Sequence, residues 1–161
     1  MAKILVAYYS KTGHTKQMAE SVVEGAVEGD ADVDCKTVDR LDAKELLDYD
    51  GLIVGSPVYY GQPAAPVKEL IDISVGIHGR LAGRVGAAFA ASANIGGGNE
   101  TTCLALLQMM LVHGMIVVGS AEGGHYGPAA VGAPDDRARK QCQALGNRVA
   151  QVAKLLERGR G

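Results

Sequence analysis

Apolar residues recur along the chain in two patterns, and the first of them predicts strands. Five short runs are apolar almost without interruption, which is typical of parallel strands buried on both faces of a sheet. They span residues 4–9, 33–38, 51–56, 84–91 and 115–118. We expect the second run to be the least buried, because it carries Asp34 and Lys36.

The second pattern places apolar residues three and four positions apart and predicts helices. These stretches are 15–29, 43–47, 66–74, 99–112 and a last helix that begins at Asp135-Asp136. Stretch 99–112 is apolar over most of its circumference, so it is either deeply buried or packed on another subunit. Strands alternating with helices predict one α/β domain over residues 1–161, with a doubly wound parallel sheet.

Composition narrows the function classes without naming one. The 161 residues are 47% apolar and 21% charged, an ordinary globular mixture, and the net charge of −2 gives no reason to expect nucleic acid or an acidic membrane surface as partner. No apolar run approaches the roughly 20 residues of a membrane span, and the N-terminus has no signal peptide pattern. Three scattered cysteines predict reduced thiols in a cytoplasmic protein, and four scattered histidines predict no metal site.

A polar turn between the first strand and the first helix is the strongest candidate for ligand binding. It consists of Ser10, Lys11, Thr12, Gly13, His14 and Thr15. A helix start offers unpaired N–H groups and the positive end of the helix dipole, and the turn has no carboxylate that would repel a phosphate. The same residue types also cap helices in many α/β domains, so both interpretations stay open. The spacing matches neither common nucleotide signature, but it does match the [ST]-x-T-G-x-T loop with which flavodoxins hold flavin mononucleotide (FMN).

Two more uncharged loops follow strand ends that should meet at the same edge of the sheet. The tyrosines of the first could lie beside a flat ring system, or belong to a subunit contact. The glycines of the second could bring backbone N–H groups close to a heterocycle, or form a mere linker. The residues concerned are Ser56, Pro57, Val58, Tyr59, Tyr60 and Gly61 in the first loop, and Ser92, Ala93, Asn94, Ile95, Gly96, Gly97 and Gly98 in the second.

Together these segments resemble the flavodoxin-like superfamily, and most closely the WrbA-type NAD(P)H:quinone oxidoreductases. The resemblance rests on KILVAYYSKTGHT, DYDGLIVGSPVYYG, GGGNETT, HGMIVVG and HYGPAAV. It implies a five-stranded sheet of order 2-1-3-4-5 with helices on both faces. It also implies that FMN phosphate lies on residues 10–15, with the isoalloxazine between the loops 57–61 and 92–98. His113 would lie near the flavin, and Tyr126 in a loop that approaches the ring.

His113 also has a case of its own. It ends an apolar helix, where the dipole favours a protonated imidazole that could donate a proton or hydrogen bond to a quinone oxygen. Alternatively, it caps the last carbonyls of that helix.

The chain departs from the family pattern in three respects. It lacks two insertions of the longer members, which help to build the tetramer and the shared active site; Thr12 replaces a frequent tyrosine; and there is no tryptophan. The expected function is transfer of electrons from NAD(P)H through FMN to a quinone-like acceptor, with a flavodoxin-type electron carrier as the alternative. The apolar helix predicts a homo-oligomer, a dimer or a tetramer.

Overall fold

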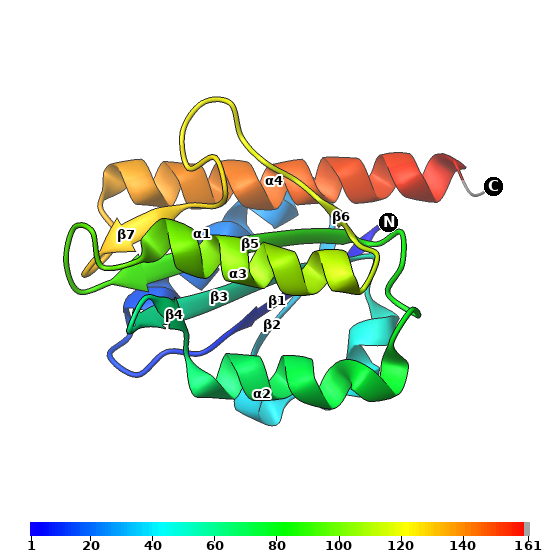
Figure 1. The fold of residues 1–161 in the computed structure, drawn as a ribbon. Helices are drawn as coiled ribbons and strands as arrows, with labels where there is room; N and C mark the ends of the chain where they lie inside the picture. The colour runs from blue at the N-terminus through cyan, green and yellow to red at the C-terminus, as the bar shows by residue number, and fades with distance from the viewer. Residues whose placement is uncertain (160–161) are drawn as a thin grey trace.

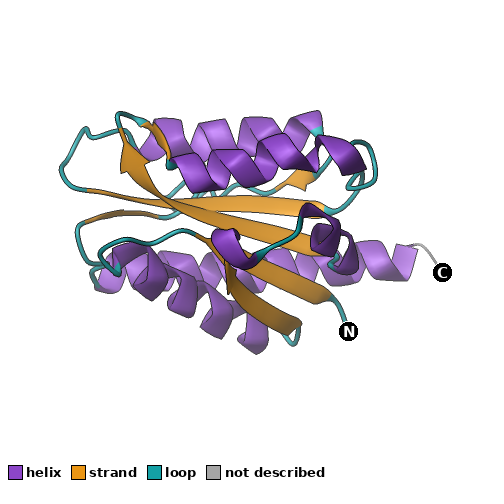
Figure 2. Ribbon diagram, turned by 90° about the horizontal axis from the view of Figure 1, so that it is seen from below, coloured by secondary structure: helices purple, strands orange, loops and turns teal. Residues whose placement is uncertain are grey.

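A parallel sheet lies between two layers of helices (Figures 1 and 2). The structure, a computed structural model, describes residues 1–159, so the last two residues of the predicted domain lie outside the described part. The main strands run in the order β2-β1-β3-β5-β6 and are all parallel, which confirms the predicted order 2-1-3-4-5. Their bounds are β1 Lys3–Tyr8, β2 Asp32–Thr37, β3 Gly51–Tyr59, β5 Val85–Ser92 and β6 Ile116–Val117.

Each face of the sheet has its own hydrophobic core, because successive side chains of a strand point to opposite faces. Ile4 and Val6 of β1 pack with the helices α1 and α4, whereas Leu5 and Ala7 pack with α2 and α3. The helices span α1 His14–Glu28, α2 Ala65–Ile73, α3 Asn99–Val112 and α4 Asp136–Gly159.

Helices α1 and α4 approach so closely that glycine is required where they cross. A Cβ on Gly146 would lie 2.0 Å from the carbonyl oxygen of Val22, and one on Gly25 would lie 1.8 Å from that of Gln143. The two backbones therefore touch directly, and the pair covers one face of the sheet.

Two short strands were not expected from the sequence. β4 (Gln62–Pro63) pairs antiparallel with the end of β3, and β7 (Ala129–Val131) pairs parallel with the end of β5. The fifth strand is thus split into β6 and β7 by the loop 118–128. Gly127 allows the chain to return to the sheet, since a Cβ there would lie 2.1 Å from the carbonyl oxygen of Ala88.

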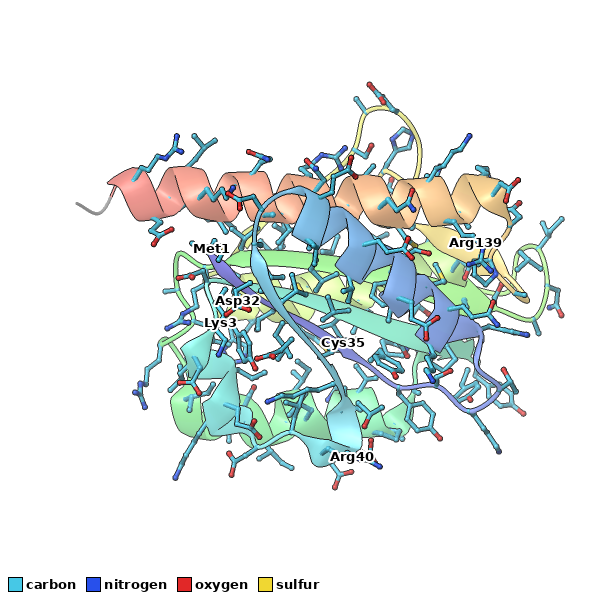
Figure 3. The ribbon with its side chains drawn as sticks, turned by 180° about the vertical axis from the view of Figure 1, so that it is seen from behind. Met1, Lys3, Asp32, Cys35, Arg40 and Arg139 are labelled. Carbon is cyan, nitrogen blue, oxygen red and sulfur yellow. The ribbon has the colours of Figure 1, made fainter. Side chains whose placement is uncertain are left out.

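The segment between β2 and β3 contains 3₁₀ helices rather than an α-helix, at Val38–Arg40 and Ala43–Asp48. The second begins with a reciprocal capping box of Asp42 and Glu45. Strand β2, which carries Asp32 and Cys35 (Figure 3), forms an edge of the sheet and is only partly buried, as its charges predicted. None of the helices within residues 1–159 is long and apolar enough to cross a bilayer.

Candidate flavin site

The turn after β1 leaves the start of α1 open. Gly13 precedes the helix with a φ of 97°, a conformation that glycine adopts without strain. The Ser10 Oγ accepts the N–H of Gly13 at 3.1 Å and that of Lys16 at 3.3 Å. Among the described residues nothing accepts the N–H groups of His14 and Thr15. Ser10 therefore caps part of the helix start, and two N–H donors stay available for an anion.

The second predicted loop is a tight hairpin between β3 and β4. Tyr60 (φ 51°) and Gly61 (φ 74°) form its turn, and the Tyr60 side chain is fully exposed. Ser56 closes the foot of the hairpin, because its buried hydroxyl donates to the Pro57 carbonyl at 2.7 Å and accepts the Ala64 N–H at 2.8 Å. This side chain is fully used inside the protein, so it serves the loop rather than a ligand.

The third loop packs against this hairpin. A Cβ on Gly98 would lie 2.6 Å from Gly61 Cα and 3.2 Å from Val58 Cγ1, and the φ of Gly98 is 111°. Thr101 Oγ1 lies 3.0 Å from both the Gly61 and the Gly98 carbonyl oxygens and so links the two loops. At the other end of the loop, the Ser92 hydroxyl donates to the Asn94 carbonyl at 2.8 Å.

The three loops enclose a hollow of about 410 Å³, within the range of small-molecule and cofactor sites. Within residues 1–159, no carboxylate lines it. Tyr59 lies in its wall, and burial raises the pKa of that phenol. The lining residues are Ser10, Lys11, Thr12, His14, Thr15, Pro57, Val58, Tyr59, Ala91, Ser92, Ala93 and Gly132.

Ala91 and Gly132 were missed from the sequence. Gly132 reaches the hollow because it follows β7, and its N–H donates to the Ser92 carbonyl at 2.8 Å. The GPAAV segment that precedes it offered a signal through the family resemblance, but not through the hydrophobic pattern.

Several predicted residues do not line this hollow. Asn94, Ile95 and Gly96 lie in the exposed part of the third loop, and Tyr126 is exposed in the loop 118–128. The others outside the lining are Gly13, Ser56, Tyr60, Gly61, Gly97 and Gly98, which shape the loops, and His113.

His113 lies at the far end of α3 from the three loops. The helix has 14 residues, so its ends are roughly 20 Å apart. The imidazole is buried, and its Nε2 lies 2.7 Å from Ser74 Oγ, whose hydroxyl donates to the Ile71 carbonyl at 2.6 Å. Since that hydroxyl has one hydrogen, Nε2 must be the donor toward Ser74.

The surroundings of His113 oppose the protonated form that the helix dipole favours. Burial, and secondarily the neighbouring His78, lowers the pKa of the imidazole below its usual value. Nor does the ring cap the last carbonyls of its helix, because it contacts Ser74 instead. Within one chain, His113 is a neutral core histidine.

A twisted parallel sheet, an open helix start after β1 and a hollow at the carboxyl ends of β1, β3 and β5 define a flavodoxin-like protein. Comparison with known proteins agrees. Residues 42–124 match the NADPH-dependent FMN reductase family. The chain belongs to this family, and within it to the WrbA-type proteins that the sequence motifs resemble.

The similarity to known proteins extends over nearly the whole chain. An NAD(P)H dehydrogenase (quinone) from Archaeoglobus fulgidus is 35% identical and covers 97% of this chain and 100% of its own length. A flavodoxin from Aquifex aeolicus is 38% identical, over 99% of this chain and 91% of its own. The crystal structure of the flavodoxin, WrbA-like protein from Agrobacterium tumefaciens has a TM-score of 0.79 at 27% identity, and covers 96% of this chain and 99% of that one.

The first of these alignments spans 190 positions, whereas this chain has 161 residues. The Archaeoglobus protein therefore carries additional segments relative to this chain.

Proposed function

We propose that this protein is an FMN-dependent oxidoreductase that passes electrons from NAD(P)H to a quinone-like acceptor. The observation that carries the proposal is the hollow of three loops, which joins open helix N–H groups to uncharged walls. An anionic group and a flat, largely uncharged ring system are the two parts of FMN, and the hollow offers a complementary surface to each.

The residues present fit this cofactor. The N–H groups of His14 and Thr15 would hold the phosphate, with the Ser10 hydroxyl hydrogen and the Lys11 ammonium beside them. The ring would lie between Pro57–Tyr59 and Ser92–Ala93. When bound, flavin supplies hydride acceptance and one- or two-electron transfer, and the protein supplies orientation and electrostatics.

The chain's own contribution is a wall without carboxylates. A fixed negative charge beside the ring would disfavour any step that increases electron density there, and would repel an anionic dinucleotide. The lining has neither Asp nor Glu, and the nearest fixed charge in it is that of Lys11. This supports NAD(P)H as the electron donor, as do the names of the Archaeoglobus fulgidus and Sinorhizobium fredii relatives, both NAD(P)H dehydrogenase (quinone).

The second candidate is an electron carrier reduced by a partner protein. The observation in its favour is the Aquifex aeolicus relative, named flavodoxin, which matches almost the whole chain. A carrier that docks by charge needs a strongly acidic rim, and the loops 56–62 and 92–99 contain no acid. The enzyme is therefore the better supported function.

One titration separates the two functions. FMN is added to the purified protein and followed by its visible absorbance, and NADH or NADPH is then added without oxygen. Bleaching within seconds, followed by reoxidation with a quinone, supports the enzyme. Bound flavin that only dithionite or a reductase bleaches would establish the carrier, and absence of flavin binding would refute both.

We further propose a cytoplasmic homo-oligomer. Cys35, Cys103 and Cys142 are free thiols, as in reduced compartments. Leu111 and Val112 at the end of α3 are more than half exposed, which supports a subunit contact there. A role for His113 at a flavin would need such a second chain, because its own helix separates it from its own hollow. A monomer by light scattering at micromolar concentration would contradict the oligomer.

A further inference from the structure

The side chain of Asn99 joins the third loop to β7. Asn99 is the first residue of α3, and its Nδ2 donates to Ser92 Oγ at 2.8 Å and to the Ala130 carbonyl at 3.3 Å. One side chain thus connects the start of the third loop with the short strand that completes the split fifth strand.

The orientation of this amide is fixed by its neighbours. The Ser92 hydroxyl spends its hydrogen on the Asn94 carbonyl, so Ser92 Oγ can only accept from Asn99, and the Ala130 carbonyl also only accepts. Both N–H groups of Asn99 therefore face these acceptors. Its Oδ1 is left buried, without a hydrogen-bond partner in residues 1–159.

An unpartnered buried acceptor lowers stability, so this arrangement is poorly explained by stability alone. What the amide does accomplish is geometric. Ser92 and Gly132 both line the hollow, and the Gly132 N–H donates to the Ser92 carbonyl beside the Asn99 contact. Residues 93–96 of the loop are exposed, so the Ser92 hydroxyl, the amide of Asn99 and the link through Thr101 are its main side-chain anchors.

We propose that Asn99 is the positioning residue of the flavin site, acting through Ser92 and β7 on the wall that faces the ring. The proposal rests on the proposed flavin binding. It assigns a role to a residue that does not itself line the hollow.

The test compares Asn99→Leu, which keeps the approximate shape and removes both donors, with Asn147→Leu, the same change on α4 away from the hollow. Dissociation constants for FMN and riboflavin are measured by flavin fluorescence. We expect Asn99→Leu to raise the dissociation constants of FMN and riboflavin by a similar factor of at least about tenfold. The factors should be similar because the substitution moves the wall beside the ring, which both flavins have, and not the turn that would hold the FMN phosphate. Asn147→Leu should stay within about twofold of wild type.

A double-mutant cycle tests the route of action. If Asn99 acts through Ser92, the double variant with Ser92→Ala should bind FMN about as weakly as Asn99→Leu alone. Strictly additive losses, or a loss that merely follows a lowered melting temperature of the apoprotein, would overturn the proposal in favour of general destabilisation.

Hydrogen exchange of the apoprotein provides a readout without flavin. Asn99→Leu should speed exchange at the N–H groups of Gly97 and Gly132 at least severalfold and leave residues 10–15 unchanged, since only the first two belong to the segments that the amide joins. Unchanged exchange at both glycines overturns the proposal even where affinity falls. Wild-type protein that binds no FMN refutes the proposed function instead, and the exchange result then decides this inference alone.

Discussion

Replacing Gly98 by alanine should damage the flavin site more than it damages the fold. Gly98 has a φ of 111°, and an added Cβ would lie 2.6 Å from the Cα of Gly61 across the two loops. Placing a side chain at a left-handed position costs about 1–2 kcal/mol, and forcing extra atoms into a packed contact costs about 1–3 kcal/mol more. The free energy of unfolding of the variant is therefore expected to fall by about 2–5 kcal/mol unless the third loop moves away from the hairpin.

Gly96→Ala is the matched control. Gly96 has a φ of 72°, and a Cβ there would meet nothing within 4 Å, so this variant carries backbone strain without the clash. Both variants are unfolded in urea, and FMN affinity is measured by fluorescence quenching. We expect Gly96→Ala to bind FMN within about threefold of wild type. Relief of the clash in Gly98→Ala should open the hollow and weaken binding by at least about tenfold, or about 1.4 kcal/mol.

The difference between the two variants tests the reasoning. Equal affinities would mean that the approach of Gly98 to Gly61 does not shape the site. A Gly98→Ala protein that loses stability but binds FMN normally would likewise refute the link between this contact and the hollow.

Three further predictions follow from other contacts. Gly146→Ala should lower the free energy of unfolding by about 2 kcal/mol or more, although alanine is the better helix former, because its Cβ would lie 2.0 Å from a backbone oxygen of α1. Gly159→Ala in the same helix meets nothing within 4 Å and should be neutral or stabilising in the same urea titration. Ser10→Ala removes the acceptor of two N–H groups and should lower the free energy of unfolding by about 1 kcal/mol. If this turn holds the phosphate, the same variant should lose more affinity for FMN than for riboflavin. The lowered pKa of His113 means that the unfolded chain binds a proton more readily, so its contribution to stability is present above its usual pKa and is lost as the pH falls below it. His113→Phe should flatten the dependence of urea midpoints on pH between about 5 and 7, and an unchanged slope would contradict this assignment.

The strands and helices of the core could be predicted because their apolar periodicity is long enough to be read without tertiary context. Helix α3 runs from Asn99 to Val112, the range that the pattern indicates. The strands β4 and β7 have two and three residues, too few for a period, and they exist because the chain returns alongside β3 and β5. The local pattern of apolar residues does not show where the chain returns to the sheet.

The candidate site also has a part that the sequence could predict and a part that it could not. The turn 10–15 joins one strand to the next helix, so its placement was fixed as soon as both elements were recognised. His113 was assigned to the flavin by resemblance and to a charged state by its position at a helix end. Burial beside Ser74, which no linear spacing reveals, instead lowers the pKa of its imidazole.

The same device closes all three loops of the hollow. Ser10 follows β1, Ser56 lies in the second half of β3 and Ser92 ends β5, and each hydroxyl oxygen accepts an N–H from its own loop or the element after it. The hydroxyls of Ser56 and Ser92, two residues predicted to bind the cofactor, thus act as internal closures. Because these closures need no ligand and no charge, the hollow is preformed without any carboxylate among its described lining residues. A preformed site without carboxylates admits both an anionic hydride donor and an uncharged acceptor, which is the requirement of a quinone oxidoreductase and not of a carrier that docks by charge.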